Sequence, residues 1–291
     1  MKILVLGSKG QLGQCLNDQL AITEHEVIYT SREQIDITDF EETNTQILKI
    51  SPDIVINATA YTAVDMAEKD YKAADLINHR AVANIASTCN QLDCWLIHIS
   101  TDYVFDGNSE VPYKEDNPTN PQGVYGDTKL KGEAAIDVSG CKYLIIRTSW
   151  VYSEYGNNFL KTMLRLGAEL DELSIVGDQI GCPTYAQDIA KTIVSILSFL
   201  DLKRSSSGIY HYCGDEPCSW YDFGLAIFLE AEVQGLKTPS YVKLIKTESY
   251  PTPAIRPAYS VLDCSSIESC FDVTRSNWRD GIKIVIDRLQ G

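Results

Sequence analysis

Five short apolar runs punctuate the first half of the chain, each followed by small or polar residues. The first is Lys2–Leu6, and similar runs occupy 26–29, 53–58, 95–100 and 143–147. Continuous apolar runs of this length predict strands buried on both faces of a parallel sheet. Helically spaced apolar residues lie between them, for example Leu16 and Leu20, and over 73–90. This alternation predicts an α/β fold with a doubly wound parallel sheet.

The pattern is less regular after residue 150. Helices are predicted over 158–170 and 188–200, and strands over 173–176 and 208–213. The helix at 188–200 carries few charges and is expected to pack back on the sheet. Ser219, with Asp222 three residues later, predicts a helix N-terminus. We therefore expect a sheet domain of residues 1–150 plus about 185–215, and a smaller domain of 151–184 plus about 216–291.

Composition and charge narrow the functional classes. The 291 residues carry a net charge of −15 and show no basic run, so nucleic acid is not an expected partner. The nine cysteines have no C-x-x-C spacing, which argues against zinc and a disulfide framework and favours a cytoplasmic location. The N-terminal run is too short for a signal peptide, and no membrane-spanning segment is expected.

A glycine loop follows the first predicted strand directly. Gly7, Gly10 and Gly13 have the spacing G-x-x-G-x-x-G and open a helical pattern. Strand, glycine loop and helix together predict a pyrophosphate at the helix N-terminus, and hence a bound dinucleotide.

The end of the second predicted strand bears on the choice of cofactor. NAD enzymes usually place an acidic residue there for the ribose 2′-hydroxyl, whereas this chain has Ser31 and Arg32. Those residues favour the 2′-phosphate of NADP, although Arg32 is equally interpreted as a solvated loop charge. Asp36 and Ile37 are expected near the adenine.

Small and hydroxylated residues follow the third and fourth predicted strands. Ala58, Thr59, Ala60 and Thr62 would let a cofactor lie across the strand ends. Thr101 is placed to bind a substrate carbonyl, or alternatively to bond the backbone at the strand end. His98 is interpreted as an ordinary strand position and Asn78 as a polar residue on a helix face.

Tyr125 and Lys129 lie at the centre of residues 120–133. A helix is expected to begin between Pro121 and Tyr125, so the two side chains would share one helix face. A phenol titrates near ~10, and a neighbouring cation lowers that pKa. Such a pair suits proton donation to a ketone while hydride arrives at carbon. Taken alone, it is also explained by an incidental pair on a surface helix.

Eight segments in succession resemble one known family over nearly the whole chain. They are GSKGQLG, ATAYTAVDMAE, STDYVFDG, YGDTKLKGE, RTSWVY, DQIGCPT, SWYDF and RPAYSVLD. The chain resembles the extended short-chain dehydrogenase/reductases, and within them the dTDP-4-dehydrorhamnose reductase family. The resemblance implies a Rossmann-type fold with a smaller C-terminal substrate-binding domain. It also implies reduction of the 4-keto group of dTDP-4-dehydro-L-rhamnose with NADPH or NADH.

The resemblance also implies roles for individual residues. Tyr125 would be the general acid, Lys129 its ribose-binding partner, and Thr101 would orient the keto oxygen. The pyrophosphate would be held by Gly7, Gly10, Gln11, Leu12 and Gly13. The sugar nucleotide would meet Val64, Thr101, Tyr103, Trp150, Asn158 and Arg256, with Trp150 packing on the sugar.

One position departs from the family pattern. Some members dimerise through Mg²⁺ held by acidic residues, one of them two positions after the third glycine, where this chain has Cys15. A thiol is a poor Mg²⁺ ligand. We therefore expect no Mg²⁺, and a monomer or weak homodimer that is not metal-bridged.

Several alternatives stay open. In the related 4,6-dehydratases the threonine is typically followed by Asp-Glu, whereas Thr101 is followed by Asp102 and Tyr103, which argues against dehydration. A reductase of another dTDP- or UDP-4-keto-6-deoxy sugar is possible. So is a non-catalytic NADP-binding regulatory subunit similar to the methionine adenosyltransferase β subunit. A rhamnose product would feed lipopolysaccharide O-antigen, another rhamnosylated polymer or a small glycoside.

Overall fold

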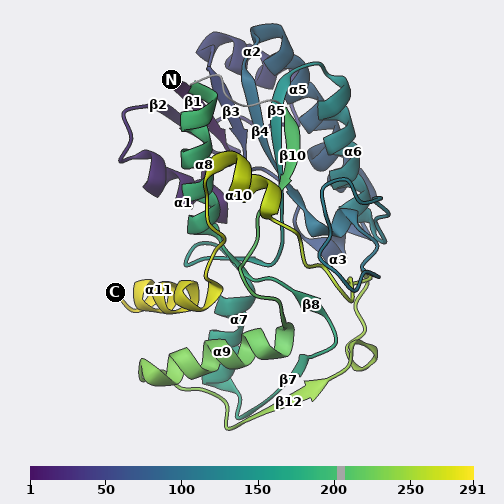
Figure 1. The fold of residues 1–291 in the computed structure, drawn as a ribbon, viewed down its shortest axis with the longest axis vertical. Coiled ribbons are helices and arrows are strands. Elements are labelled where there is room, and N and C mark those ends of the chain that lie inside the picture. The colour runs from purple at the N-terminus through teal and green to yellow at the C-terminus, as the bar shows by residue number, and fades with distance from the viewer. Residues whose placement is uncertain (202–206) are drawn as a thin grey trace.

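A central sheet of parallel strands organises the computed structural model, which describes residues 1–201 and 207–291 (Figure 1). The strand order is β10-β5-β4-β3-β1-β2. The chain runs outwards from β1 to β2 on one side, and to β3, β4, β5 and β10 on the other. The strands are β1 (Lys2–Leu6), β2 (Glu26–Thr30), β3 (Ile54–Asn57), β4 (Trp95–Thr101), β5 (Lys142–Thr148) and β10 (Gly208–His211). This confirms the predicted doubly wound sheet, with its switch point between β1 and β3.

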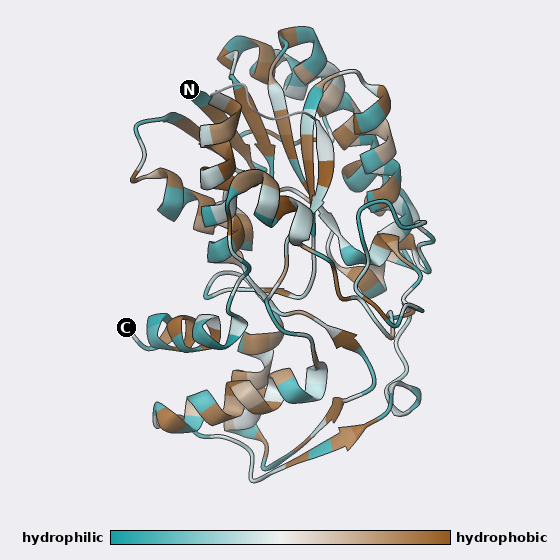
Figure 2. Ribbon diagram, in the orientation of Figure 1, coloured by the Kyte–Doolittle hydropathy of each residue, from teal (hydrophilic) through white to brown (hydrophobic). Residues whose placement is uncertain are grey.

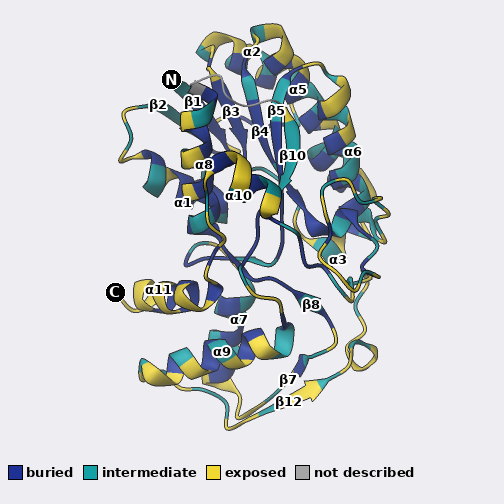
Figure 3. Cartoon of the chain, viewed as in Figure 1, coloured by how far each residue is buried: buried dark blue, intermediate teal, exposed yellow. Residues whose placement is uncertain are grey.

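Helices cover both faces of the sheet because alternate strand residues point to opposite sides. Ile3 and Val5 pack in the core under α1, α8 and α10, whereas Leu4 and Leu6 pack in the core under α2, α5 and α6. Figure 2 shows the strands as the hydrophobic centre, and Figure 3 shows the inner strands as mostly buried and the edge strand β10 as intermediate. These helices are α1 (Gln11–Leu20), α2 (Phe40–Ile50), α5 (Ala81–Leu92), α6 (Val124–Val138), α8 (Ala186–Asp201) and α10 (Ser265–Phe271).

A smaller helical part lies below the sheet in Figure 1. Its core gathers around Tyr152, Phe223 and Trp278. It contains α7 (Phe159–Glu169), α9 (Trp220–Val233) and α11 (Trp278–Gln290), with the paired strands β7 (Glu172–Val176) and β12 (Tyr241–Ile245). Two further short pairs are β6 (Val151–Tyr152) with β9 (Thr184–Tyr185), and β8 (Ile180–Gly181) with β11 (Cys218–Ser219).

The domain division stays a prediction. Helix α10 contacts α8 and β10, so it packs with the sheet although its residues were assigned to the smaller domain. Residues 202–206 of the predicted division lie outside the described residues. Within the described ranges, no helix is both long and apolar enough to cross a membrane.

The predicted strand ends agree with the structure to within two residues, but one helix differs. The region 73–90 contains α4 (Tyr71–Asp75), a π-helical turn η1 (Leu76–Arg80) and then α5. The predicted helix start at Ser219 is confirmed, because Ser219 and Asp222 form a capping box. The remaining short elements are α3 (Val64–Ala67) and the 3₁₀ turns η2 (Asp102–Val104) and η3 (Thr247–Ser249).

Candidate active site

The turn between β1 and α1 is shaped by glycine. Gly7 has φ +86°, and a Cβ there would lie 3.1 Å from the Ala58 carbonyl oxygen. Gly10 is the N-cap of α1 and makes no side-chain capping bond, so the N-cap residue does not satisfy the first N–H groups of the helix. An uncapped helix N-terminus of this kind binds phosphate readily. Gly10, Gln11 and Leu12 line the adjacent cleft, as a pyrophosphate site requires.

Gly13 is a glycine for a different structural reason from Gly7 and Gly10. A Cβ on Gly13 would lie 2.2 Å from the Gly7 carbonyl oxygen and 2.7 Å from Ser8 Cα. The residue lines neither of the two clefts described below. Its missing side chain lets α1 pack directly on the loop, and the predicted pyrophosphate contact stays a prediction.

An outer cleft of about 260 Å³ extends from the glycine loop to the end of β2. Arg32 Nε lies 3.3 Å from Asp36 Oδ2, and the Arg32 side chain is largely exposed. A hydrogen bond from the Thr38 hydroxyl lowers the pKa of Asp36, and Arg32 lowers it by a smaller amount. The predicted cofactor residues that line this cleft are Gly7, Gly10, Ser31, Arg32, Asp36, Ile37, Ala58, Thr59 and Ala60.

An inner cleft of about 670 Å³ adjoins the outer one, because Gly10, Ala58, Thr59 and Ala60 line both. It lies beyond the carboxyl ends of β3, β4 and β5, where open α/β sheets bind ligands. The other predicted residues in its wall are Gln11, Leu12, Thr62, Val64, Thr101, Tyr103, Tyr125, Lys129, Trp150 and Asn158. The structure therefore brings the three predicted catalytic residues into one cleft.

Close packing places Tyr125 in this cleft. Helix α6 begins at Val124, whose N–H donates to Glu68 Oε1 at 2.8 Å. A Cβ on Gly126 would lie 2.1 Å from the Tyr103 carbonyl oxygen, so the first turn of α6 lies directly on η2. The Tyr103 and Tyr125 rings meet edge to face, with centroids 5.5 Å apart. This contact sets Tyr125 beside the end of β4, where Thr101 lies.

The pKa of Tyr125 is raised, contrary to the sequence prediction. Burial raises it to about 12, a hydrogen bond with Thr101 lowers it, and the charge of Asp102 raises it further. The expected lowering by Lys129 was wrong for this structure, because burial dominates. At neutral pH Tyr125 therefore keeps its phenol proton, which is the state that a proton donor needs.

Lys129 is buried and contacts β4. Its Nζ lies 2.6 Å from the Ile99 carbonyl oxygen and 3.1 Å from His98 Nε2, and only 1% of the residue is exposed. Burial lowers the pKa of Lys129 to about 8, and the negative charge of Glu133 opposes that shift. A lysine so placed changes its charge in a pH range where enzymes work.

Both faces of the Trp150 ring are covered. Trp220 stacks on one face, with ring centroids 3.5 Å apart and planes 7° apart. A Cβ on Gly181 would lie 2.4 Å from Trp150 Cε2, a ring-fusion atom approachable only from above or below the plane. Trp150, which has φ +46°, thus presents an edge to the cleft, and its predicted packing on the sugar stays a prediction. Trp220 also lines the cleft and was not predicted.

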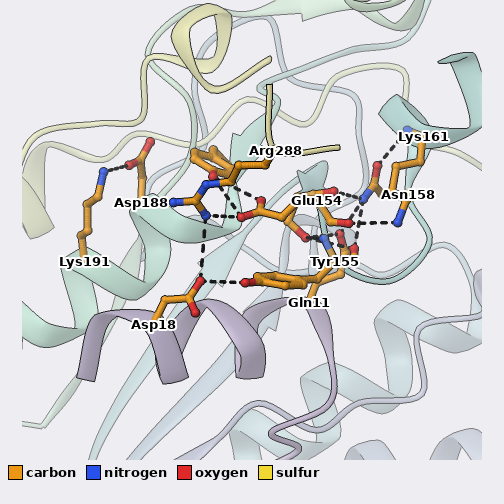
Figure 4. A network of polar contacts seen from close by, with 11 residues as sticks. Gln11, Asp18, Glu154, Tyr155, Asn158, Lys161, Asp188, Lys191 and Arg288 are labelled. Atoms are coloured by element: carbon orange, nitrogen blue, oxygen red, sulfur yellow. Dashed lines mark hydrogen bonds and ion pairs between the residues drawn. The ribbon is translucent and has the colours of Figure 1, made fainter. Parts of the chain in front are cut away.

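The Asn158 amide is committed to internal hydrogen bonds. Its Nδ2 donates to Gln11 Oε1 at 2.9 Å and to the Ser153 carbonyl at 2.7 Å, while its Oδ1 caps α7 through Lys161 N–H at 3.1 Å (Figure 4). Asn158 therefore connects α7 to the glycine loop. The predicted substrate contact would have to compete with these bonds.

Arg256 does not line the inner cleft, unlike the predicted substrate residues Val64 and Tyr103. Its guanidinium pairs with Asp65 Oδ2 at 2.7 Å. Its NH1 group is buried and has no hydrogen-bond partner within residues 1–201 and 207–291. The predicted anion ligand is thus already neutralised by one carboxylate, with one donor unused.

The whole chain matches one known family. A family model described as the RmlD substrate binding domain covers residues 1–291. The chain belongs to the RmlD family. It is 42% identical to a dTDP-4-dehydrorhamnose reductase of Aggregatibacter actinomycetemcomitans over 97% of both chains. A dTDP-4-dehydrorhamnose reductase structure from Clostridium acetobutylicum is 40% identical, with TM-score 0.91 and full coverage of both chains. One from Bacillus anthracis, in complex with NADP, is 34% identical, with TM-score 0.91 and 99% coverage of both.

The sequence interpretation missed the contacts of two buried polar residues in this RmlD-family chain. Asn78 is 1% exposed, accepts from Tyr61 N–H at 2.8 Å and donates to Thr128 Oγ1 at 3.2 Å, so it connects the cleft-lining loop to α6. His98 is fully buried against Lys129. A polar residue inside an apolar strand, as His98 is, was the available signal, since buried polar groups need partners.

Cys15, the position at which this chain departs from the RmlD-family pattern, is a buried thiol. Burial raises its pKa, and the charges of Glu154 and Asp18 add to the rise. Arg288 pairs with Glu154 and lies 3.9 Å from Asp18, so the nearby carboxylates have a cationic side chain as counterion (Figure 4). The described residues contain no cluster of three or more potential metal ligands. The expected oligomeric state, without a metal bridge, stays a prediction.

Proposed function

We propose that this protein is a reductase that converts the 4-keto group of dTDP-4-dehydro-L-rhamnose to the hydroxyl of dTDP-L-rhamnose, with NADPH as preferred cofactor. The observation that carries the proposal is the convergence of Thr101 with Tyr125, a phenol that keeps its proton at neutral pH, in the inner cleft. Membership of the RmlD family supports the choice of substrate.

The adjoining clefts fit a dinucleotide. The backbone around Gly7 and Gly10 offers a cradle that a Cβ would fill, at an uncapped helix N-terminus. Arg32 in the outer cleft would meet a 2′-phosphate, which favours NADPH over NADH. When bound, the cofactor supplies a hydride to C4 of the sugar.

The remaining chemistry belongs to the protein. Thr101 Oγ1 donates to Asp102 Oδ1 at 3.0 Å, and would turn that hydrogen to the keto oxygen. Tyr125 would give its phenol proton to the same oxygen, leaving a phenolate. Lys129 in its ammonium form would stabilise that phenolate by charge, because the low-polarity cleft strengthens the attraction.

Cofactor oxidation with dTDP-4-dehydro-6-deoxyglucose, alone and with a 3,5-epimerase, tests the proposal. Oxidation only with the epimerase is expected, at a higher rate for NADPH than for NADH. Oxidation without it would identify a reductase of another keto sugar, and no oxidation despite NADPH binding would indicate a regulatory subunit. Tyr125→Phe should abolish turnover and leave NADPH binding nearly intact, whereas undiminished turnover would remove Tyr125 from the proton-donor role.

A further inference from the structure

A chain of buried side chains connects Lys129 to the cofactor-lining loop. Asn57 ends β3 and His98 is its direct neighbour on β4, and both are fully buried. Asn57 Nδ2 lies 3.2 Å from His98 Nδ1, and His98 Nε2 lies 3.1 Å from Lys129 Nζ. At the other end Asn57 Oδ1 accepts from Thr59 N–H at 3.1 Å and from the Thr59 hydroxyl. None of these contacts is needed to form the sheet, whose ladder uses backbone groups.

The hydrogen bonds of this chain have one consistent direction. The Thr59 backbone N–H can only donate, which fixes Asn57 Oδ1 as the acceptor and turns Asn57 Nδ2 towards His98. His98 Nδ1 must then accept, so a neutral imidazole carries its hydrogen on Nε2. That hydrogen points at Lys129 Nζ. A free amine can accept it and still donate to the Ile99 carbonyl, whereas an ammonium has no lone pair and would meet the N–H as donor against donor.

We propose that Asn57 and His98 are positioning residues that hold Lys129 against β4 and oppose its ammonium form. Asn57 selects the imidazole tautomer, and His98 presents the resulting N–H to the amine. These hydrogen-bonded side chains thereby set the pH above which Lys129 loses its proton. Above that pH the cleft lacks the positive charge that stabilises the Tyr125 phenolate. This inference rests on the proposed function for its catalytic consequence, but the hydrogen-bond arrangement does not.

The other charges near Lys129 define the competition. On α6, Glu133 favours the ammonium, but it is engaged by Arg147 of β5 in a pair whose NH2–Oε2 distance is 2.7 Å. Asp102, after β4, acts on Tyr125 in the same cleft. Burial of Lys129 opposes its ammonium charge in the same sense as His98 does. Burial of His98, and then the Lys129 charge, lower the pKa of His98, which keeps the imidazole neutral.

The tautomer can be read directly in the full-length protein. Nitrogen NMR of ¹⁵N-histidine-labelled protein separates protonated from unprotonated ring nitrogens, and His98→Gln identifies the signal among the four histidines. We expect a neutral His98 with hydrogen on Nε2 at every pH at which the protein is folded. Hydrogen on Nδ1, or a cationic ring near neutral pH, would overturn the proposal, whatever reaction the protein performs.

Asn57→Asp reverses the chain with almost no change of shape. The new carboxylate still accepts from Thr59 and now also accepts from His98 Nδ1–H, so Nε2 becomes an acceptor for the Lys129 ammonium. The alkaline limb of kcat for NADPH oxidation should then move up by about one pH unit. The exposed Asn17→Asp adds the same charge outside the chain and should leave that limb in place.

The outcomes separate this inference from the proposed function. An unmoved limb in Asn57→Asp, or an equal movement in Asn17→Asp, would refute the role in setting the charge of Lys129. Absence of turnover in the unaltered protein would refute the proposed function. In that case the ¹³Cε signal of Lys129, titrated with and without Asn57→Asp, still reports the shift, and equal titration midpoints would overturn the proposal.

Discussion

The buried carboxyl of Asp102 makes stability depend on pH in a predictable way. Asp102 is 3% exposed, and its Oδ2 has no hydrogen-bond partner among the described residues. Burial raises its pKa from 3.8 to about 6, although Ser260 and Thr101 donate hydrogen bonds that oppose the rise. A shift of about two units corresponds to about 3 kcal/mol of free energy between the two protonation states.

The sign follows from the raised pKa. The folded protein favours the protonated carboxyl, so this stabilisation is complete below the unfolded pKa and is lost as pH rises through about 6. Asp102→Asn removes the ionisation and its cost. Integrating the two titration curves, we expect the variant to gain about 1.4 kcal/mol relative to the parent protein between pH 5 and pH 8. Urea unfolding followed by tryptophan fluorescence at both pH values measures the gain.

A neighbouring carboxyl supplies the control. Asp106 accepts a hydrogen bond from the Tyr113 hydroxyl at 2.7 Å. This bond is the largest cause of the lowered pKa of Asp106. Its pH window therefore lies below 3.8, and Asp106→Asn should be destabilised equally at pH 5 and pH 8. A stability difference for Asp102→Asn that is also independent of pH would refute the assignment of a raised pKa to Asp102.

Three further variants test other parts of the site. Arg32→Ala should raise KM for NADPH about tenfold and leave KM for NADH nearly unchanged in steady-state kinetics, because only the 2′-phosphate loses a partner; equal effects would refute the NADP preference. Glu133→Gln should destabilise the fold by about 3–5 kcal/mol in urea unfolding, since it leaves Arg147 buried and unpaired, and adding Arg147→Met should recover much of the loss. Gly13→Ala should weaken NADPH binding in a fluorescence titration, because its Cβ would force the Gly7 carbonyl away; unchanged affinity would contradict that packing role.

Features encoded locally could be predicted from the sequence. Strand ends follow from apolar runs bounded by small residues, and in a parallel sheet the carboxyl ends share one edge. That rule was sufficient to bring Ala58, Thr101 and the glycine loop together. The pair of Tyr125 and Lys129 needed only the helix period.

Features set by contacts between distant segments could not be predicted. The pKa of Tyr125 depends on how deeply α6 packs on η2, and no local pattern reports burial. The Trp150 ring is covered by Trp220, seventy positions later, and by Gly181. Residue type alone therefore identified Trp150 as an aromatic residue of the cleft wall, but it did not show which surface of the ring is available.

The chemistry of α6 depends on how the helix packs in the fold more than on the Tyr-x-x-x-Lys spacing. Gly126 lets the helix meet the Tyr103 carbonyl, and Gly132 lets it meet the Asn78 carbonyl, where a Cβ would lie 2.2 Å away. Between these two contacts Lys129 is pressed against β4. Close packing fixes the helix along its length and buries Lys129, while Tyr125 stays partly exposed in the cleft wall. The same two glycines therefore position the phenol and the amine, so neither glycine should accept alanine without a displacement of α6.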